Sequence, residues 1–163
     1  MGRQLKVKKE ELAYIAGFLD GDGSLIFQLK KRKDTKRGKR LMATICFYQD
    51  TRHEDPLFWI QKKLNAGYIS RRNDGMTELR INGFQKVKDI LTLLQPYLRF
   101  KKKQASYFLE VLKILTQKNI GEISFKEKKK IVRCLINMRK EGYQSGKKKE
   151  EKLKEDLLQI FNL

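Results

Sequence analysis

The feature that most constrains the fold of this chain is an apolar helix that runs directly into the segment Asp-Gly-Asp-Gly at residues 20–23 and then into an alternating strand. Residues 10–19 are good helix formers with acids at the front, so they predict a helix that ends in a glycine-rich cap. In residues 24–33, the apolar side chains of Leu25, Phe27 and Leu29 alternate with polar ones, which is typical of a strand with one buried face. The chain therefore begins by packing a helix against a sheet.

The rest of the sequence predicts a second hairpin and further helices. Residues 34–39 form a basic turn, and residues 40–48 alternate again, which completes a first hairpin. The other expected elements are a helix at 55–64, a hairpin of 67–72 and 76–82, and helices at 84–94, 101–117, 125–140 and from about 147. We expect an α+β fold of order αββαββα, in which helices cover one face of a four-stranded antiparallel sheet. It is predicted to be one domain over residues 1–163, with its core at about 10–140 and a basic helical extension at 141–163.

The charge of the chain indicates a polyanionic partner. Lys and Arg number 38 against 19 Asp and Glu, which gives a net charge of +19. Ribosomal or membrane-surface proteins share such a charge, but 40% hydrophobic and 10% aromatic residues indicate a packed domain rather than a basic tail. Cys46 and Cys134 have no metal-like spacing and predict a reducing compartment, and we expect no membrane segment. Nucleic acid is the first candidate partner.

The sheet face turned away from the core is predicted to carry basic and polar side chains. Such a surface can enter the major groove of DNA, where Arg suits guanine and Gln suits adenine. The alternative is the ordinary polar outer face of a half-exposed sheet, and the positive charge favours DNA. The candidate DNA-binding residues are Ser24, Ile26, Gln28, Lys30, Arg32, Arg40, Met42, Thr44, Cys46, Tyr48, Tyr68, Ser70, Arg72, Glu78 and Arg80.

Asp20 and Asp22 stand at the end of the first predicted helix, where the helix dipole already places negative charge. A divalent cation would offset this repulsion, and Mg²⁺ is typically held by one or two carboxylates, phosphate oxygens and water. A glycine-rich turn with locally hydrogen-bonded Asp residues remains the alternative. An EF-hand is excluded, because Leu25 stands at the sixth loop position and Lys31 at the twelfth.

Small residues recur at helical spacing in the same helix, and they would let a second helix approach closely. Close packing against the domain's own sheet is the alternative, and spacing alone does not separate the two. The candidate contact residues for a second copy are Ala13, Ala16, Gly17, Asp20 and Gly21.

Residues 12–24, which read LAYIAGFLDGDGS, resemble the signature motif of the LAGLIDADG homing endonucleases. The resemblance continues to Gln49 and resumes at residues 94–105, which look like single-motif chloroplast intron enzymes, so it covers about residues 10–140. It implies a saddle over DNA with paired motif helices at a two-fold axis. With one motif in this chain, it implies a homodimer that cuts a near-palindromic site of roughly 20 base pairs by metal-dependent phosphodiester hydrolysis.

The resemblance also implies roles for individual residues. Asp22 and the main-chain carbonyl of Gly21 would bind Mg²⁺, with Mn²⁺ accepted and Ca²⁺ bound without efficient cleavage. Lys101 would stabilise transition-state charge or organise solvent, and Gln49 would position the water network. The sequence departs from the family just after Gln49, where an arginine that helps the active-site water network is expected but residues 50–53 read Asp-Thr-Arg-His. Ungapped alignment puts His53 at that position, and Arg52 is the alternative.

Related functions stay open on the same fold. Some relatives are maturases that assist the splicing of intron RNA, and others are regulators that bind DNA without cutting it. Here the predicted catalytic residues are all present, which favours cleavage. The resemblance suggests an organellar, intron-encoded protein, and a free-standing prokaryotic one is the alternative.

Overall fold

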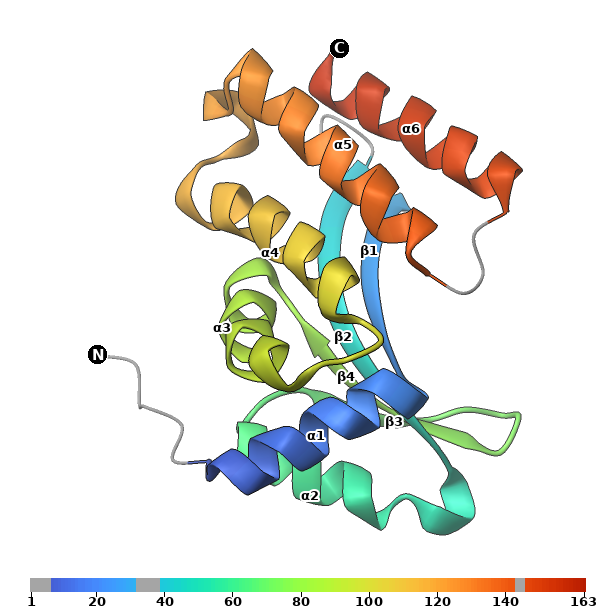
Figure 1. Ribbon diagram of the computed structural model, residues 1–163. Helices are drawn as coiled ribbons and strands as arrows, with labels where there is room; N and C mark the ends of the chain where they lie inside the picture. The colour runs from blue at the N-terminus through green and yellow to red at the C-terminus, as the bar shows by residue number, and fades with distance from the viewer. Residues whose placement is uncertain (1–6, 32–38, 143–145) are drawn as a thin grey trace.

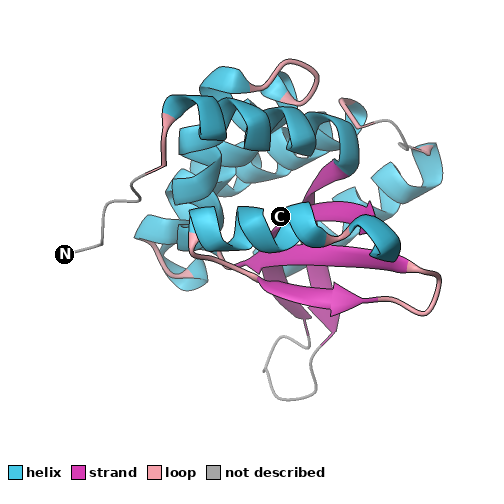
Figure 2. Cartoon of the chain, turned by 90° about the horizontal axis from the view of Figure 1, so that it is seen from below, coloured by secondary structure: helices cyan, strands magenta, loops and turns pink. Residues whose placement is uncertain are grey.

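One antiparallel sheet and a layer of helices make up the fold (Figures 1 and 2). The computed structural model describes residues 7–31, 39–142 and 146–163. Its strands are paired in the order β1-β2-β4-β3, with bounds β1 Gly23–Lys31, β2 Lys39–Asp50, β3 Tyr68–Arg71 and β4 Met76–Asn82. The α-helices are α1 Lys9–Asp22, α2 Asp55–Leu64, α3 Phe84–Leu94, α4 Lys102–Gln117, α5 Phe125–Lys140 and α6 Lys147–Phe161. Short 3-10 turns are η1 Thr51–His53, η2 Gln95–Tyr97 and η3 Ile120–Glu122. The predicted α+β architecture is confirmed.

The register of the sheet separates a core face from an outer face. Leu25 pairs with Ile45, and Ile45 pairs with Ile81, so these side chains share one face and are buried against the helices. The next row holds Ser24, Cys46, Arg80 and Tyr68 on the opposite face. The two-residue alternation seen in the sequence therefore places apolar and polar side chains on the expected sides of the hairpins.

Helix α1 extends further than the sequence predicted, because it continues through residues 20–22 as its last turn. Gly23 ends the helix in an extended conformation with φ of −137° rather than a left-handed one. A Cβ atom added at Gly23 would lie 2.6 Å from Leu19 Cδ1 and 2.8 Å from the Leu19 carbonyl oxygen. The predicted end of the helix after residue 19 is thus three residues too early, and Gly23, which is the C-cap, is required for the close approach of β1 to α1.

The C-terminal helices lie at the far end of the sheet from α1 and α2 (Figure 1). Helix α6 is joined to the first hairpin by an ion pair of 2.7 Å between Lys39 Nζ and Asp156 Oδ1. Its apolar residues Leu157, Ile160 and Phe161 complete the buried core. Across the described ranges, no helix combines the length and apolar character that crossing a bilayer requires.

Candidate metal and nucleic-acid site

Asp20 is a buried carboxylate that caps the start of helix α4. Its Oδ2 accepts hydrogen bonds from the main-chain N–H groups of Arg99 at 2.6 Å and Phe100 at 3.2 Å, and its Oδ1 accepts one from Lys101 at 2.9 Å. The negative charge at the end of α1 therefore lies against the positive N-terminal end of α4. For Asp20, main-chain N–H groups rather than a cation offset the repulsion between its carboxylate and the negative end of the helix.

Lys101 caps the end of helix α1 in return. Its Nζ donates to the main-chain carbonyl oxygen of Asp20 at 2.7 Å, and its side chain is buried. Burial lowers the pKa of Lys101, although the nearby charges of Asp20 and Asp22 act in the opposite direction. The two helix ends thus cap each other, and the lysine is held within electrostatic reach of Asp22.

Asp22 is the exposed last residue of α1. Among the described residues, no side chain forms an ion pair with its carboxylate, and no group of three His, Cys, Asp or Glu residues is arranged to hold a metal ion. The main-chain carbonyl of Gly21 lies in the last helical turn, where carbonyl groups lack intrahelical partners. Asp22 and Gly21 therefore fit a hard cation that takes its remaining oxygen ligands from outside one copy of the chain.

Gln49 lies near the end of β2, two residues beyond Phe47, which pairs with Gly23 directly after α1. Its Oε1 accepts the main-chain N–H of Asp50 at 2.9 Å. This register places the end of β2 beside the end of α1. The part of Gln49 in a site with Asp22 and Lys101 stays a prediction.

The residues that depart from the family pattern bind each other. Arg52 Nε donates to Asp50 Oδ1 at 3.0 Å and Arg52 Nη2 to Asp50 Oδ2 at 2.8 Å. The side-chain hydrogen bonds from Arg52 lower the pKa of Asp50 far below its ordinary value. His53 is exposed at the end of the same turn. Arg52 is thus held by its neighbour, and the structure does not bring it or His53 into hydrogen-bonding contact with the described residues around Asp22.

The outer face of the sheet gathers most of the predicted DNA-binding side chains. Lys30, Arg40, Tyr68 and Arg72 are exposed, and the remaining accessible members are partly buried. Their contact with DNA stays a prediction. The partly buried members are Ser24, Ile26, Gln28, Met42, Tyr48, Ser70 and Arg80, whereas Arg32 lies outside the described residues.

Three predicted contact residues on this face are instead buried by their neighbours. Thr44 and Cys46 have no exposed surface, and Glu78 is 6% exposed. The hydroxyl of Thr44 donates to Asn82 Oδ1 at 2.7 Å, and Glu78 binds two arginines. A side chain without accessible surface cannot contact a base, so the prediction of direct contact is wrong for Thr44 and Cys46, while both carboxylate oxygens of Glu78 are bound by arginines. Asn82 was missed, although it stands two residues after Arg80 and the same alternation places it on this face.

Tyr48 lies over the buried centre of the outer face. Burial, reinforced by the neighbouring Cys46 thiol, raises the pKa of Tyr48 to about 12, while a hydrogen bond with Ser24 acts in the opposite direction. Burial likewise raises the pKa of the Cys46 thiol. Both groups therefore remain neutral at physiological pH.

Fewer residues of α1 are accessible for contact with a second copy than the sequence predicted. Ala13, Gly17 and Gly21 are exposed, and a Cβ added at either glycine would meet no described atom within 4 Å. Ala16 is fully buried in the core of its own chain, and Asp20 is 8% exposed and bound to main-chain N–H groups. Ala16 therefore offers no side-chain surface to a second copy and Asp20 offers little, because its carboxylate is bound within its own chain, and their assignment to such a contact is corrected.

Known proteins with similar sequences include a matching family and two DNA endonucleases. The family model described as LAGLIDADG endonuclease matches residues 15–115. The chain is 34% identical over 105 residues to DNA endonuclease I-CvuI of Chlorella vulgaris, a match that covers 64% of this chain and 65% of that protein. It is also 34% identical over 110 residues to DNA endonuclease I-CreI of Chlamydomonas reinhardtii, a match that covers 68% of this chain and 67% of that protein.

Solved structures share the fold over almost the whole chain. I-CvuI in complex with an I-CreI target superposes with a TM-score of 0.72 at 28% identity, covering 95% of this chain and 96% of that one. The archaeal intron-encoded homing endonuclease I-Vdi141I, complexed with DNA, gives a TM-score of 0.74 at 22% identity, and the match covers 94% of this chain and 95% of that one. With the family model matched over residues 15–115 and the motif helix and the two hairpins in their expected places, the chain belongs to the LAGLIDADG endonuclease family.

Proposed function

We propose that this chain is a homing endonuclease that cuts both strands of a long pseudo-palindromic DNA site as a homodimer. The observation that carries the proposal is the exposed Asp22 carboxylate beside the buried Lys101, at the edge of a basic sheet face. The related I-CvuI was solved with DNA targets in the presence of 2 mM Mg and of 2 mM Ca. These relatives support double-stranded DNA and a divalent cation as partners.

The residues of the chain divide the chemistry among themselves. Asp22 and the Gly21 carbonyl would hold Mg²⁺, which would supply an activated water and stabilise the departing oxygen. Lys101 uses one N–H on the Asp20 carbonyl and directs its positive charge toward phosphate oxygens near Asp22. Gln49 positions solvent through its amide group. Mn²⁺ would replace Mg²⁺, whereas Ca²⁺ would allow binding with little cleavage.

A single motif requires two copies of the chain to cut two strands. The exposed stripe of Ala13, Gly17 and Gly21 allows two α1 helices to approach closely, which brings one Asp22 from each copy to the two-fold axis. Each sheet then faces one half of a symmetric DNA site. By analogy with the algal relatives we place the protein in an organelle, with its intron RNA as a further possible ligand.

The test is a selection of cleaved sites from a randomised, near-palindromic DNA library with Mg²⁺. Wild type and the control Asp89→Asn, which changes an exposed carboxylate on α3, should cut the same symmetric sites. Asp22→Asn should bind those sites in Ca²⁺ and leave them intact in Mg²⁺. If wild type cuts nothing but binds specific DNA or RNA, the maturase or regulator function takes the place of cleavage.

A further inference from the structure

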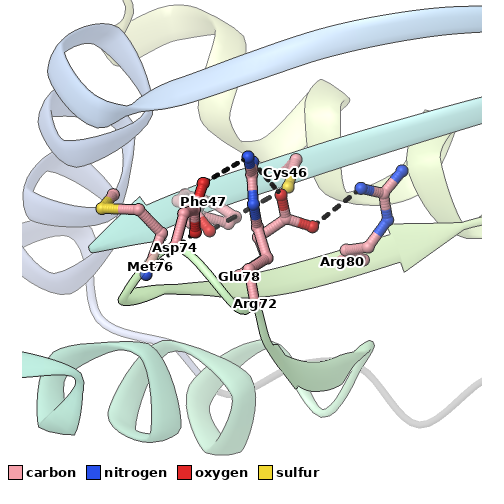
Figure 3. A network of polar contacts seen from close by, with 7 residues as sticks. All are labelled: Cys46, Phe47, Arg72, Asp74, Met76, Glu78 and Arg80. Carbon is pink, nitrogen blue, oxygen red and sulfur yellow. Dashed lines mark hydrogen bonds and ion pairs between the residues drawn. The ribbon is translucent and has the colours of Figure 1, made fainter. Parts of the chain in front are cut away.

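A buried carboxylate on the outer face of the sheet joins two arginines (Figure 3). Glu78 Oε1 accepts a hydrogen bond from Arg72 Nη1 at 3.0 Å, and Glu78 Oε2 accepts one from Arg80 Nη1 at 2.9 Å. The Glu78 side chain is 8% exposed, whereas Arg72 is 48% and Arg80 20% exposed. The acid therefore lies beneath the two cations, and its charge is directed at them rather than at solvent.

The charge of Glu78 is maintained by this arrangement. Burial acts to raise the pKa of Glu78, but the hydrogen bonds from Arg80 and Arg72 outweigh it, so the pKa lies below its ordinary value. A carboxylate that stays ionised fixes each guanidinium group through one Nη atom. Ordering these long side chains in advance reduces the entropy that binding would otherwise cost.

The two arginines differ in how they are held. Arg72 Nη2 also donates to Asp74 Oδ2 at 2.6 Å, in a pair whose side chains are both about half exposed. Exposed ion pairs contribute little free energy, so a DNA acceptor can replace Asp74. Arg80 is bound through Nη1, and within the described part of the chain its Nε and Nη2 form no hydrogen bond, so the edge between them can donate two parallel hydrogen bonds.

We propose that Glu78 is a positioning residue that holds Arg80 and Arg72 for the recognition of guanines in the major groove of the target. This inference rests on the proposed function, because it names the bases that the sheet recognises. A bidentate arginine suits the O6 and N7 atoms of guanine, and no other base pair offers that pair of acceptors. Glu78 itself touches no base, which agrees with its burial.

The shared carboxylate also limits the distance between the two recognised bases. Each guanidinium nitrogen lies one hydrogen bond from an oxygen of the same carboxylate, so the two nitrogens are at most about 8 Å apart. Stacked base pairs are about 3.4 Å apart. The shared carboxylate thus keeps the two arginines side by side, and we expect two guanines close together in each half-site, on either strand.

The experiment is a binding selection from a randomised half-site library in Ca²⁺, so that cleavage plays no part. We compare wild type with Glu78→Gln, which keeps the size of the side chain but removes its charge. The matched control is Glu54→Gln, because Glu54 Oε1 also binds an arginine, Arg71, at 2.6 Å, but Arg71 alternates onto the face opposite to that of Ser70. Wild type should enrich guanine at two positions, and Glu78→Gln should lose about tenfold in discrimination at both of them.

The control should keep both guanine preferences, since Arg71 does not face the DNA. The inference is overturned if Glu78→Gln keeps the wild-type preferences, or if Glu54→Gln loses them equally. Should Glu78→Gln fail to fold, Arg80→Lys and Arg72→Lys must each erase a different guanine position, and retention of both positions overturns the inference. A wild type that selects no DNA sequence at all would refute the proposed function instead.

Discussion

The two carboxylates in the last turn of α1 should differ in role, with Asp20 stabilising the fold and Asp22 serving the proposed cleavage. Asp20→Asn exchanges one carboxylate oxygen for an NH2 group, and each oxygen accepts at least one main-chain N–H at the start of α4. Depending on which oxygen is retained, either the buried N–H of Lys101 or the partly buried N–H groups of Arg99 and Phe100 lose their acceptor. A hydrogen bond to a charged group contributes about 1.5–3 kcal/mol, and the loss of negative charge at a helix N-terminus adds about 0.3–1 kcal/mol.

We therefore expect the free energy of unfolding to fall by about 3 kcal/mol in Asp20→Asn. For a domain of this size that is a decrease in Tm of roughly 6–12 °C. Asp22→Asn is the matched control, because Asp22 is exposed and its change should stay within about 0.5 kcal/mol. Thermal and urea unfolding of the DNA-free protein, followed by circular dichroism, measures both. Equal melting temperatures for the two variants would refute the argument that Asp20 stabilises the helix junction.

Three further changes test other parts of the structure. Gly23→Ala should lower the free energy of unfolding by about 1–3 kcal/mol in urea, because its Cβ would collide with the preceding helical turn. Gly17→Leu should fold normally but fail to dimerise in sedimentation experiments. A stable Gly17→Leu dimer would contradict the proposed α1 contact. Since burial raises the pKa of Tyr48 to about 12, stability should fall as pH rises from 10 toward 12, and Tyr48→Phe should remove one late transition from an ultraviolet titration. The Lys118 hydrogen bond, with main-chain and hydroxyl bonds at the start of α5, lowers the pKa of Glu127 from 4.5 to about 2. Its contribution to stability should be complete above pH 4.5 and disappear as pH falls toward 2, which a carboxyl carbon NMR titration checks; a midpoint near 4.5 would contradict it.

The elements of the fold were largely predictable, because short-range patterns determine them. The alternation of Leu25, Phe27 and Leu29 identified the core face of β1, and the Asn-Asp-Gly segment identified the second hairpin, where Gly75 has a φ of +81°. The end of α1 was not predicted correctly. Gly21 usually indicates a helix end, but here contacts with β1 and α4 hold it within the last turn.

The sequence predicted on which face of the sheet each candidate residue lies, but not how deeply its side chain is buried. Strand alternation placed Thr44, Cys46 and Glu78 on the outer face correctly, yet it carries no information on how completely neighbouring long side chains cover them. The partner of Asp20 was beyond the reach of local patterns as well, because its hydrogen bonds join residues about 80 positions apart. Only the folded chain shows that Asp20 is structural while Asp22 remains accessible.

The mutual capping of α1 and α4 has a consequence for the order in which the chain folds. Residues 9–82 contain the motif helix and all four strands, but the main-chain partners of Asp20 follow at residues 99–101. The last turn of α1 therefore reaches its native form only after a loop of about 80 residues closes, with the entropic cost of that closure. A chain that ends before Arg99 lacks the N–H groups that bind Asp20 and also the core residues of α4, such as Phe108, which packs on Phe27 of β1. Under the proposed function, the cutting site and the sheet that recognises DNA are therefore completed by the same late segment of the chain.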